Sequence, residues 1–144
     1  MEARDLRKLP VDEYVALDRS DDARWEYAGG EAFAMSGASP AHNVVVDNVI
    51  AALKRLLHGR PCLPMSNGQK IATAATQGYH YPDAMVVCGK PVLDPIDEHA
   101  IANPTVLVEV LSPTTTDYSS PAPGAARGFA PAARTAATAP LVEA

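Results

Sequence analysis

Two apolar stretches decide the fold: Tyr81-Pro82-Asp83-Ala84-Met85-Val86-Val87-Cys88 and Val106-Leu107-Val108-Glu109-Val110-Leu111. Both are rich in aliphatic and β-branched residues and have the length of a strand, so each predicts a buried strand. Each also carries one acid, Asp83 near the start of the first stretch and Glu109 near the end of the second. A buried carboxylate without a partner costs several kcal/mol, so we expect a cation or a strong donor beside each acid.

The two acids indicate a metal site if their strands pair. Side chains alternate between the faces of a strand, so pairing would let both carboxylates converge at one end of a sheet. Carboxylate oxygens suit a hard cation such as Mg²⁺ or Mn²⁺, which polarises a phosphodiester and lowers the pKa of an attacking water. The same spacing also fits two structural acids satisfied by turn amides or by Lys70, and spacing alone leaves both interpretations open.

Outward from these strands, the chain predicts a mixed sheet with helices, of the α/β or α+β class. The clearest helix opens at Ser39-Pro40, repeats apolar residues every three or four positions, and ends at Gly59 and Pro61. The glycine pair Gly29-Gly30 predicts a hairpin, because adjacent glycines supply the positive φ angles of a tight turn. The other expected elements are a helix at 11–17, hairpin strands at 24–27 and 31–35, strands at 62–65, 69–73, 79–87 and 104–111, and a loop at 90–103.

Length, charge and cysteine content narrow the class of protein. A chain of 144 residues predicts one main domain. A net charge of -5 argues against tight non-specific binding of a phosphate backbone. An acid site that holds a metal could still act on a nucleic acid, because the metal neutralises its acids. Cys62 and Cys88 lack metal-binding spacing and are expected to be reduced thiols. With no signal peptide and no run of about 20 apolar residues, we expect a cytoplasmic protein that does not bind membranes.

The C-terminal stretch differs from the rest in composition. Alanine and proline dominate from Ser119 to Ala144, and the apolar residues there follow neither a helical nor a strand period. We therefore expect a domain over 1–118 and a disordered or weakly ordered tail over 119–144. A frame-shifted ending of a longer domain is the alternative, and an unfinished sheet would favour a homo-oligomer.

Three further residues are candidates for the same site. His42 lies in the first turn of the long helix, where a neutral imidazole could hydrogen-bond or shuttle a proton, or could simply be a capping or core residue. Glu31 follows the Gly-Gly turn and could point into the cleft or into solvent. Lys70 could supply a catalytic cation near the acids, although a solvated lysine is the common outcome.

Four segments carry a resemblance to a known family. They are Trp25-Glu26-Tyr27-Ala28-Gly29-Gly30-Glu31, Met35-Ser36-Gly37-Ala38-Ser39-Pro40-Ala41-His42-Asn43, Tyr81-Pro82-Asp83 and Val108-Glu109-Val110-Leu111-Ser112-Pro113-Thr114-Thr115. In this order they resemble the Uma-two (Uma2) family of endonucleases, of the restriction-endonuclease-like PD-(D/E)XK superfamily, over about Leu9 to Tyr118. The resemblance implies a mixed sheet flanked by helices, a Mg or Mn cofactor and hydrolysis of DNA. It also implies metal ligation by Asp83 and Glu109, with Glu31 and His42 lining the site.

The chain departs from the family pattern at two places. The superfamily usually has a lysine two residues after the second acid, where this chain has Leu111, and no lysine follows Lys90. Family members also continue with a charged helix and a closing strand, where this chain has an Ala/Pro-rich stretch, so we expect that helix and strand to be missing. Three functions stay open: a Mg-dependent DNA endonuclease, an inactive or truncated relative that binds without cleaving, and metal-assisted hydrolysis of another phosphoester.

Overall fold

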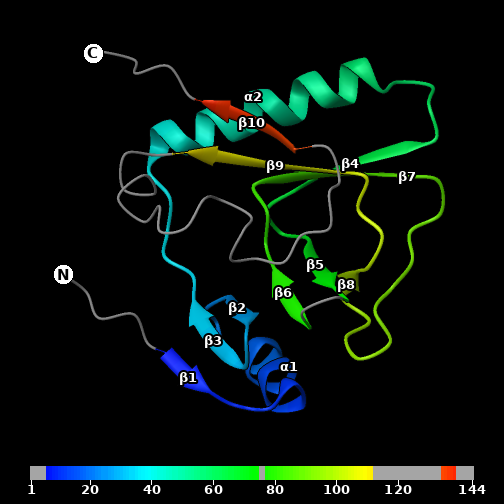
Figure 1. Cartoon of the computed structure of the whole chain (residues 1–144). Coiled ribbons are helices and arrows are strands. Elements are labelled where there is room, and N and C mark those ends of the chain that lie inside the picture. The colour runs from blue at the N-terminus through cyan, green and yellow to red at the C-terminus, as the bar shows by residue number, and fades with distance from the viewer. Residues whose placement is uncertain (1–5, 75–76, 112–133, 139–144) are drawn as a thin grey trace.

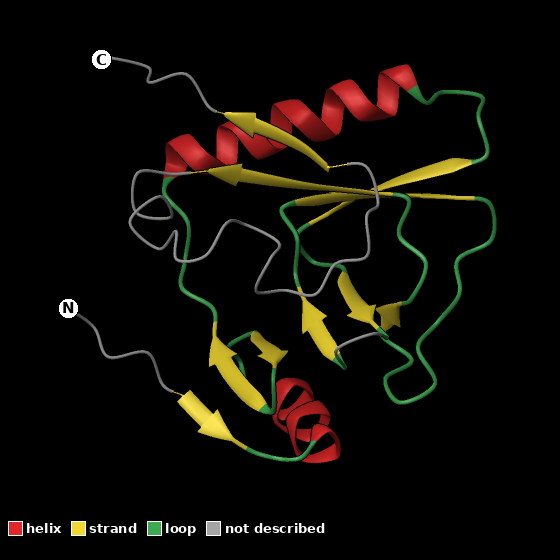
Figure 2. Cartoon of the chain, in the orientation of Figure 1, coloured by secondary structure: helices red, strands yellow, loops and turns green. Residues whose placement is uncertain are grey.

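A computed structural model describes residues 6–74, 77–111 and 134–138 of the chain (Figure 1). The described residues form two helices, which lie on two separate sheets (Figure 2). In chain order the elements are β1 (Leu6–Lys8), α1 (Val11–Ser20), β2 (Trp25–Ala28), β3 (Glu31–Ala34), α2 (Pro40–Leu56), β4 (Cys62–Ser66), β5 (Lys70–Thr73), β6 (Gly78–His80), β7 (Ala84–Cys88), β8 (Ala100–Ile101), β9 (Val106–Leu111) and β10 (Arg134–Thr138).

Both sheets are mixed, as the sequence predicts. The six-stranded sheet has the order β1-β3-β2-β6-β5-β8, and the four-stranded sheet has the order β10-β9-β7-β4. Neighbouring strands are antiparallel except for the parallel pairs β5–β8 and β9–β10. The predicted pairing of the two acid-bearing strands is confirmed, since β7 and β9 are antiparallel neighbours.

The predicted helices and hairpin form for the expected local reasons. Proline precedes α1 at its N-cap, and the Ser39 hydroxyl caps α2 by accepting a hydrogen bond of 3.2 Å from the backbone N–H of His42. The β2–β3 hairpin turns through Gly29 and Gly30, whose φ angles are +61° and +82°. Because α2 begins with this cap, His42 is fixed in its first turn.

The described residues pack into two apolar cores. One lies between α1 and the six-stranded sheet, where the rings of Tyr14 and Tyr27 stack with centroids 4.8 Å apart. The other joins the two sheets, because it combines Ile71 of β5 with Met85 and Val87 of β7. Helix α2 packs against β4, β7 and β9 of the four-stranded sheet. The two sheets are therefore held together by apolar contacts as well as by the chain that passes between them.

Cys62 and Cys88 form a disulfide, so the expectation of two reduced thiols is wrong. The two residues lie 26 positions apart in sequence but face each other directly in the β4–β7 register. Directly opposed positions of antiparallel strands bring Cβ atoms close enough for a disulfide. That proximity depends on strand register, which cysteine spacing in the sequence does not reveal.

Strand β10 lies within the expected tail. Residues 134–138 pair in parallel with β9, so this part of the stretch expected to be disordered or weakly ordered forms a strand of the four-stranded sheet. Pairing along an open sheet edge uses backbone groups, so it needs no apolar period in the sequence. The rest of the expected tail, 119–133 and 139–144, lies outside the described residues, and the domain boundary at 118 stays a prediction. No helix within the described ranges is long and apolar enough to cross a membrane.

Candidate functional site

Asp83 lies where the chain passes from β6 of one sheet to β7 of the other. Its Oδ2 atom accepts a hydrogen bond of 2.7 Å from the backbone N–H of Val110 on β9 and lies 3.3 Å from His42 Nε2. The side chain is 18% exposed. Two donors from different elements therefore hold one oxygen of a partly accessible carboxylate.

Glu109 occupies the neighbouring position on β9. The antiparallel register of β7 and β9 ends at the pair Ala84–Val108, and Asp83 and Glu109 are the next residue of each chain segment beyond that pair. Both acids therefore lie near the same end of the four-stranded sheet, and the convergence of their carboxylates on one metal stays a prediction.

His42 is the third predicted residue that lies here. Its Nε2 atom is 3.2 Å from the carbonyl oxygen of Val110 and 3.3 Å from Asp83 Oδ2. Because both neighbours accept hydrogen bonds, we place a ring proton on Nε2. Within the described part of the chain, Nδ1 is buried and has no hydrogen-bond partner. His42 therefore orients Asp83 through Nε2, and its other nitrogen is closed off from solvent.

The donor set fits a hard divalent cation. Both contacts of Asp83 in the described ranges use Oδ2, so Oδ1 remains for another ligand, and Glu109 adds a second carboxylate. Mg²⁺ keeps several waters and binds through one or two carboxylates, so it needs no larger protein cage. The arrangement therefore fits Mg²⁺ or Mn²⁺.

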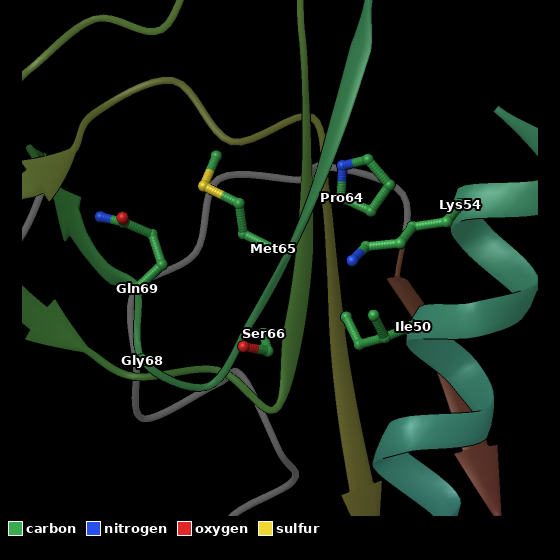
Figure 3. A pocket seen from close by; sticks show the side chains of 7 residues that line it. All are labelled: Ile50, Lys54, Pro64, Met65, Ser66, Gly68 and Gln69. Atoms are coloured by element: carbon green, nitrogen blue, oxygen red, sulfur yellow. The ribbon is translucent and has the colours of Figure 1, made fainter. Parts of the chain in front are cut away.

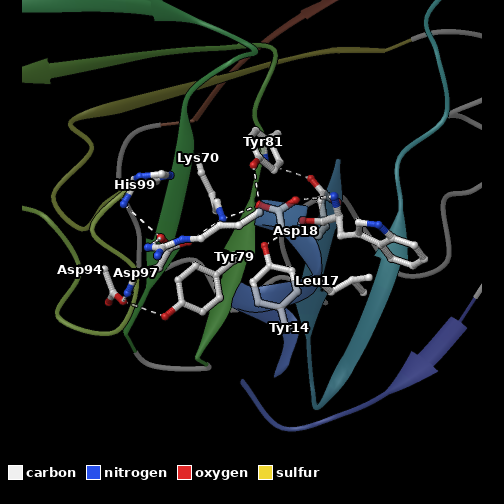
Figure 4. A network of polar contacts seen from close by, with 12 residues as sticks. Tyr14, Leu17, Asp18, Lys70, Tyr79, Tyr81, Asp94, Asp97 and His99 are labelled. Carbon is white, nitrogen blue, oxygen red and sulfur yellow. Dashed lines mark hydrogen bonds and ion pairs between the residues drawn. The ribbon is translucent and has the colours of Figure 1, made fainter. Parts of the chain in front are cut away.

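Lys70 lies in a different cluster of charges (Figure 4). Its side chain is 3% exposed, and its Nζ atom is 2.5 Å from Asp18 Oδ2 and 2.5 Å from Asp97 Oδ2. Neither Asp83 nor Glu109 is among its partners in the described ranges. A catalytic role for Lys70 stays a prediction, and both of its close contacts are with carboxylates that it neutralises.

Glu31 also lies apart from Asp83. It opens β3 of the six-stranded sheet, opposite Lys8 of β1, and its Oε1 atom is 3.8 Å from Lys8 Nζ. Its side chain is 38% exposed. The contact that the structure gives Glu31 is thus a solvent-exposed ion pair, and its expected place in the site stays a prediction.

The Lys70 cluster contains residues that sequence reasoning missed. Asp18 accepts hydrogen bonds from the Trp25 backbone N–H at 2.8 Å and from the Tyr81 hydroxyl at 2.7 Å. Asp97 accepts from Arg19 at 3.0 Å and from the His99 backbone N–H at 3.1 Å. The one available signal was a lysine at the head of an apolar strand, which implies acidic partners without showing which acids they are.

Burial and hydrogen bonding shift the acidities in this cluster. Burial alone would raise the pKa of Asp97, but hydrogen bonds from Lys70, the His99 N–H and Arg19 outweigh it and hold that pKa below its ordinary value. Burial, followed by the hydrogen bond to Asp18, raises the pKa of Tyr81. The Asp97 carboxyl is therefore held ionised to lower pH than usual, and the Tyr81 phenol keeps its proton to higher pH than usual.

A shallow cavity of about 300 Å³ lies between α2 and β4 (Figure 3). None of its lining residues belongs to the Asp83 site or to the Lys70 cluster. The cavity is lined by Ile50, Lys54, Pro64, Met65, Ser66, Gly68 and Gln69.

The fold has a counterpart among solved structures. The chain is similar to the crystal structure of a putative nuclease belonging to DUF820 from Anabaena variabilis, with a TM-score of 0.59 and 17% sequence identity. The match covers 77% of this chain and 64% of that chain. At this identity the similarity concerns the fold, and it agrees with the mixed sheets and two helices described above.

The sequence identifies the family. Residues 11–120 match Uma2, described as putative restriction endonuclease, and the chain belongs to that family. Two relatives from Synechocystis sp., the uncharacterized proteins slr1290 and sll1609, are 33% identical over 114 residues and 28% identical over 104 residues. These alignments cover 77% and 72% of this chain but 57% and 59% of the relatives, so the chain spans less than two thirds of their length.

Proposed function

We propose that this protein is a Mg²⁺-dependent DNA endonuclease with Asp83 and Glu109 as the metal ligands. The observation that carries the proposal is the fixed carboxylate of Asp83, held by Val110 and His42 at the end of the sheet that Glu109 also approaches. A carboxylate that is held through one oxygen, as Asp83 is, suits a metal that must also bind substrate. Membership of a family described as restriction endonucleases supplies the substrate class.

The roles of the residues follow from their contacts. The bound metal would polarise a phosphodiester and lower the pKa of the attacking water. Val110 and His42 hold Asp83 Oδ2, so the carboxylate does not have to be ordered when the metal arrives. Because His42 Nδ1 is buried, His42 acts as an orienting group, and a proton shuttle through that atom has no route to solvent in this conformation.

A second candidate is a relative that binds metal and DNA without cleaving. Leu111 stands where the superfamily usually has a lysine, and Lys70 is 97% buried between two other acids. A missing cation would leave developing charge in the transition state without a stabilising partner. Metal binding by Asp83 and Glu109 would persist in such a protein, since it does not depend on the missing cation.

Mn²⁺ calorimetry combined with nicking of supercoiled plasmid separates these functions. The informative variant is Asp83→Asn, and the matched control is Asp47→Asn, an exposed acid of α2 with no ion pair or hydrogen bond in the described ranges. Loss of binding and of nicking in Asp83→Asn alone supports the endonuclease. Binding without nicking by the wild type supports the second candidate, and hydrolysis of bis(p-nitrophenyl) phosphate without nicking indicates another phosphoester. Absence of Mn²⁺ binding by the wild type would overturn all three.

A further inference from the structure

The segment that carries Asp83 is a joint between the two sheets. His80 ends β6 in the six-stranded sheet and Ala84 begins β7 in the four-stranded sheet, so Tyr81, Pro82 and Asp83 bridge them. Pro82 is fully buried, and its ring fixes its own φ angle. The position of the Asp83 backbone therefore depends on how the residue before this proline is held.

Tyr81 is held at both of its ends. Its backbone N–H donates a hydrogen bond of 3.1 Å to Glu26 Oε1 on β2, and its hydroxyl donates one of 2.7 Å to Asp18 Oδ2 on α1. The guanidinium of Arg24 lies 5.7 Å from the centre of the Tyr81 ring. Arg24 also donates a hydrogen bond of 3.0 Å to the carbonyl of Asn67, in the turn where the chain crosses from β4 to β5.

Asp18, the acceptor for the Tyr81 hydroxyl, is itself fixed. The same Oδ2 atom contacts Lys70 Nζ, and Lys70 is anchored in turn by Asp97. Figure 4 shows the tyrosine, Asp18 and Lys70 converging between α1 and the six-stranded sheet. The Tyr81 hydroxyl is therefore tied to a buried charge network, not to a mobile surface acid.

We propose that Tyr81 is a positioning residue for Asp83, and that the buried Lys70–Asp18 pair is the fixed point against which it positions that acid. The contacts form one chain across the joint: Lys70 to Asp18, Asp18 to the Tyr81 hydroxyl, and Tyr81 through Pro82 to Asp83, which meets Val110 on β9. The expected effect of Tyr81 on metal binding rests on the proposed function. Its effect on the position of Asp83 does not depend on whether the protein binds a metal.

Tyr79 offers a matched control within the same molecule. Its hydroxyl also donates a hydrogen bond of 2.7 Å to a carboxylate, that of Asp94, and burial is the main cause that raises the pKa of both phenols. Asp94 lies in the loop between β7 and β8, and its Oδ2 atom also accepts a hydrogen bond of 2.9 Å from the backbone N–H of Asp97, so the Tyr79 contact orders that loop and not the segment that carries Asp83. Tyr79→Phe and Tyr81→Phe therefore each remove one comparable hydrogen bond, and only the second loosens the segment before Asp83.

The first test measures Mn²⁺ affinity by calorimetry in the full chain. Loss of a group that orients a metal ligand typically weakens binding about 10-fold or more, so we expect about a 10-fold loss in Tyr81→Phe and none in Tyr79→Phe. Urea midpoints of both variants report any shared loss of stability. Equal affinities in the two variants would overturn the proposal, provided that Asp83→Asn abolishes binding.

The second test needs no metal. The Val110 amide donates to Asp83 Oδ2, so its hydrogen exchange reports whether that carboxylate is in place. We expect Val110 to lose protection in Tyr81→Phe and to keep it in Tyr79→Phe. If the wild type fails to bind Mn²⁺, the proposed function fails while this measurement still decides the role of Tyr81. Unchanged Val110 protection in Tyr81→Phe would refute that role.

Discussion

The two charged sites of this molecule use acids in opposite ways. In the Lys70 cluster, Asp97 is fully buried, and the described contacts occupy both oxygens of Asp18 and both oxygens of Asp97. In the Asp83 site the carboxylate is 18% exposed, and its described contacts fall on one oxygen. A carboxylate with all its acceptor positions used is closed to ligands, whereas one held by a single oxygen is both positioned and available.

The comparison separates stability from function. Burying three charges in the Lys70 cluster is offset only while each has its partner, so removing one partner there should be costly. If Asp83 binds a metal as proposed, its carboxylate is not fully compensated without the cation, so Asp83 should contribute less to the stability of the fold than the acids of the Lys70 cluster. Substitutions in the Lys70 cluster should therefore lower mainly the stability of the fold, whereas substitutions at Asp83 should lower mainly the affinity for metal.

The largest expected effect is on stability, from Lys70→Met. This change leaves Asp18 and Asp97 buried without their shared cation, so we expect the free energy of unfolding to fall by about 3–5 kcal/mol. Urea denaturation followed by circular dichroism measures it. Lys54→Met, at an exposed lysine of α2, should change stability by about 0.5 kcal/mol or less. If Lys70→Met lowers the free energy of unfolding by no more than Lys54→Met does, the Lys70 cluster does not anchor the fold as described above.

Next in size is the effect of Asp97→Asn, and it should depend on pH. Because the folded-state pKa of Asp97 lies below its ordinary value, its ionised form stabilises the fold above about pH 4, and this contribution disappears as pH falls through the lower folded-state pKa. We expect a loss of about 2 kcal/mol at pH 7 that shrinks toward acidic pH. Urea midpoints from pH 7 to pH 3 measure it, with Asp47→Asn as control. A loss independent of pH would contradict the assignment.

The third prediction concerns Asp83→Asn, which should leave the fold nearly unchanged. The asparagine side chain can still accept a hydrogen bond from Val110, so we expect the free energy of unfolding to change by about 1 kcal/mol or less. Thermal unfolding without metal measures this. The wild type alone should gain stability on addition of Mn²⁺, because a ligand that binds only the folded state stabilises it. A loss comparable to that of Lys70→Met would make Asp83 a structural acid.

The smallest effect on stability is expected for His42→Leu. The change removes the Nε2 contact with Asp83, but it also removes a buried Nδ1 atom that has no partner in the described ranges, so the two contributions offset within about 1 kcal/mol. Mn²⁺ affinity should still fall, because Asp83 loses an orienting donor. Calorimetry and urea denaturation on the same sample measure both quantities. Unchanged affinity would limit the role of His42 to packing.

The sequence predicts the acid strands better than it predicts the charge network. Apolar content and β-branched residues are local, so they locate β9 and most of β7, although the strand expected over 79–87 is broken at Tyr81–Asp83 where the chain changes sheets. The partners of Lys70 lie 52 positions before it at Asp18 and 27 positions after it at Asp97, and no local pattern links residues so far apart. The sequence could not predict the Cys62–Cys88 disulfide or the β9–β10 pairing for the same reason, since both depend on strand register.

The alternation of the chain between the two sheets bears on how the protein folds. β4, β7 and β9 of one sheet are separated in sequence by β5, β6 and β8 of the other, so neither sheet is a contiguous segment of chain. Pairings between strands so distant in sequence slow folding, because long loops must close before contacts form. We therefore expect a single cooperative unfolding transition. An N-terminal fragment that ends before β9 should not fold, because the four-stranded sheet is incomplete without β9.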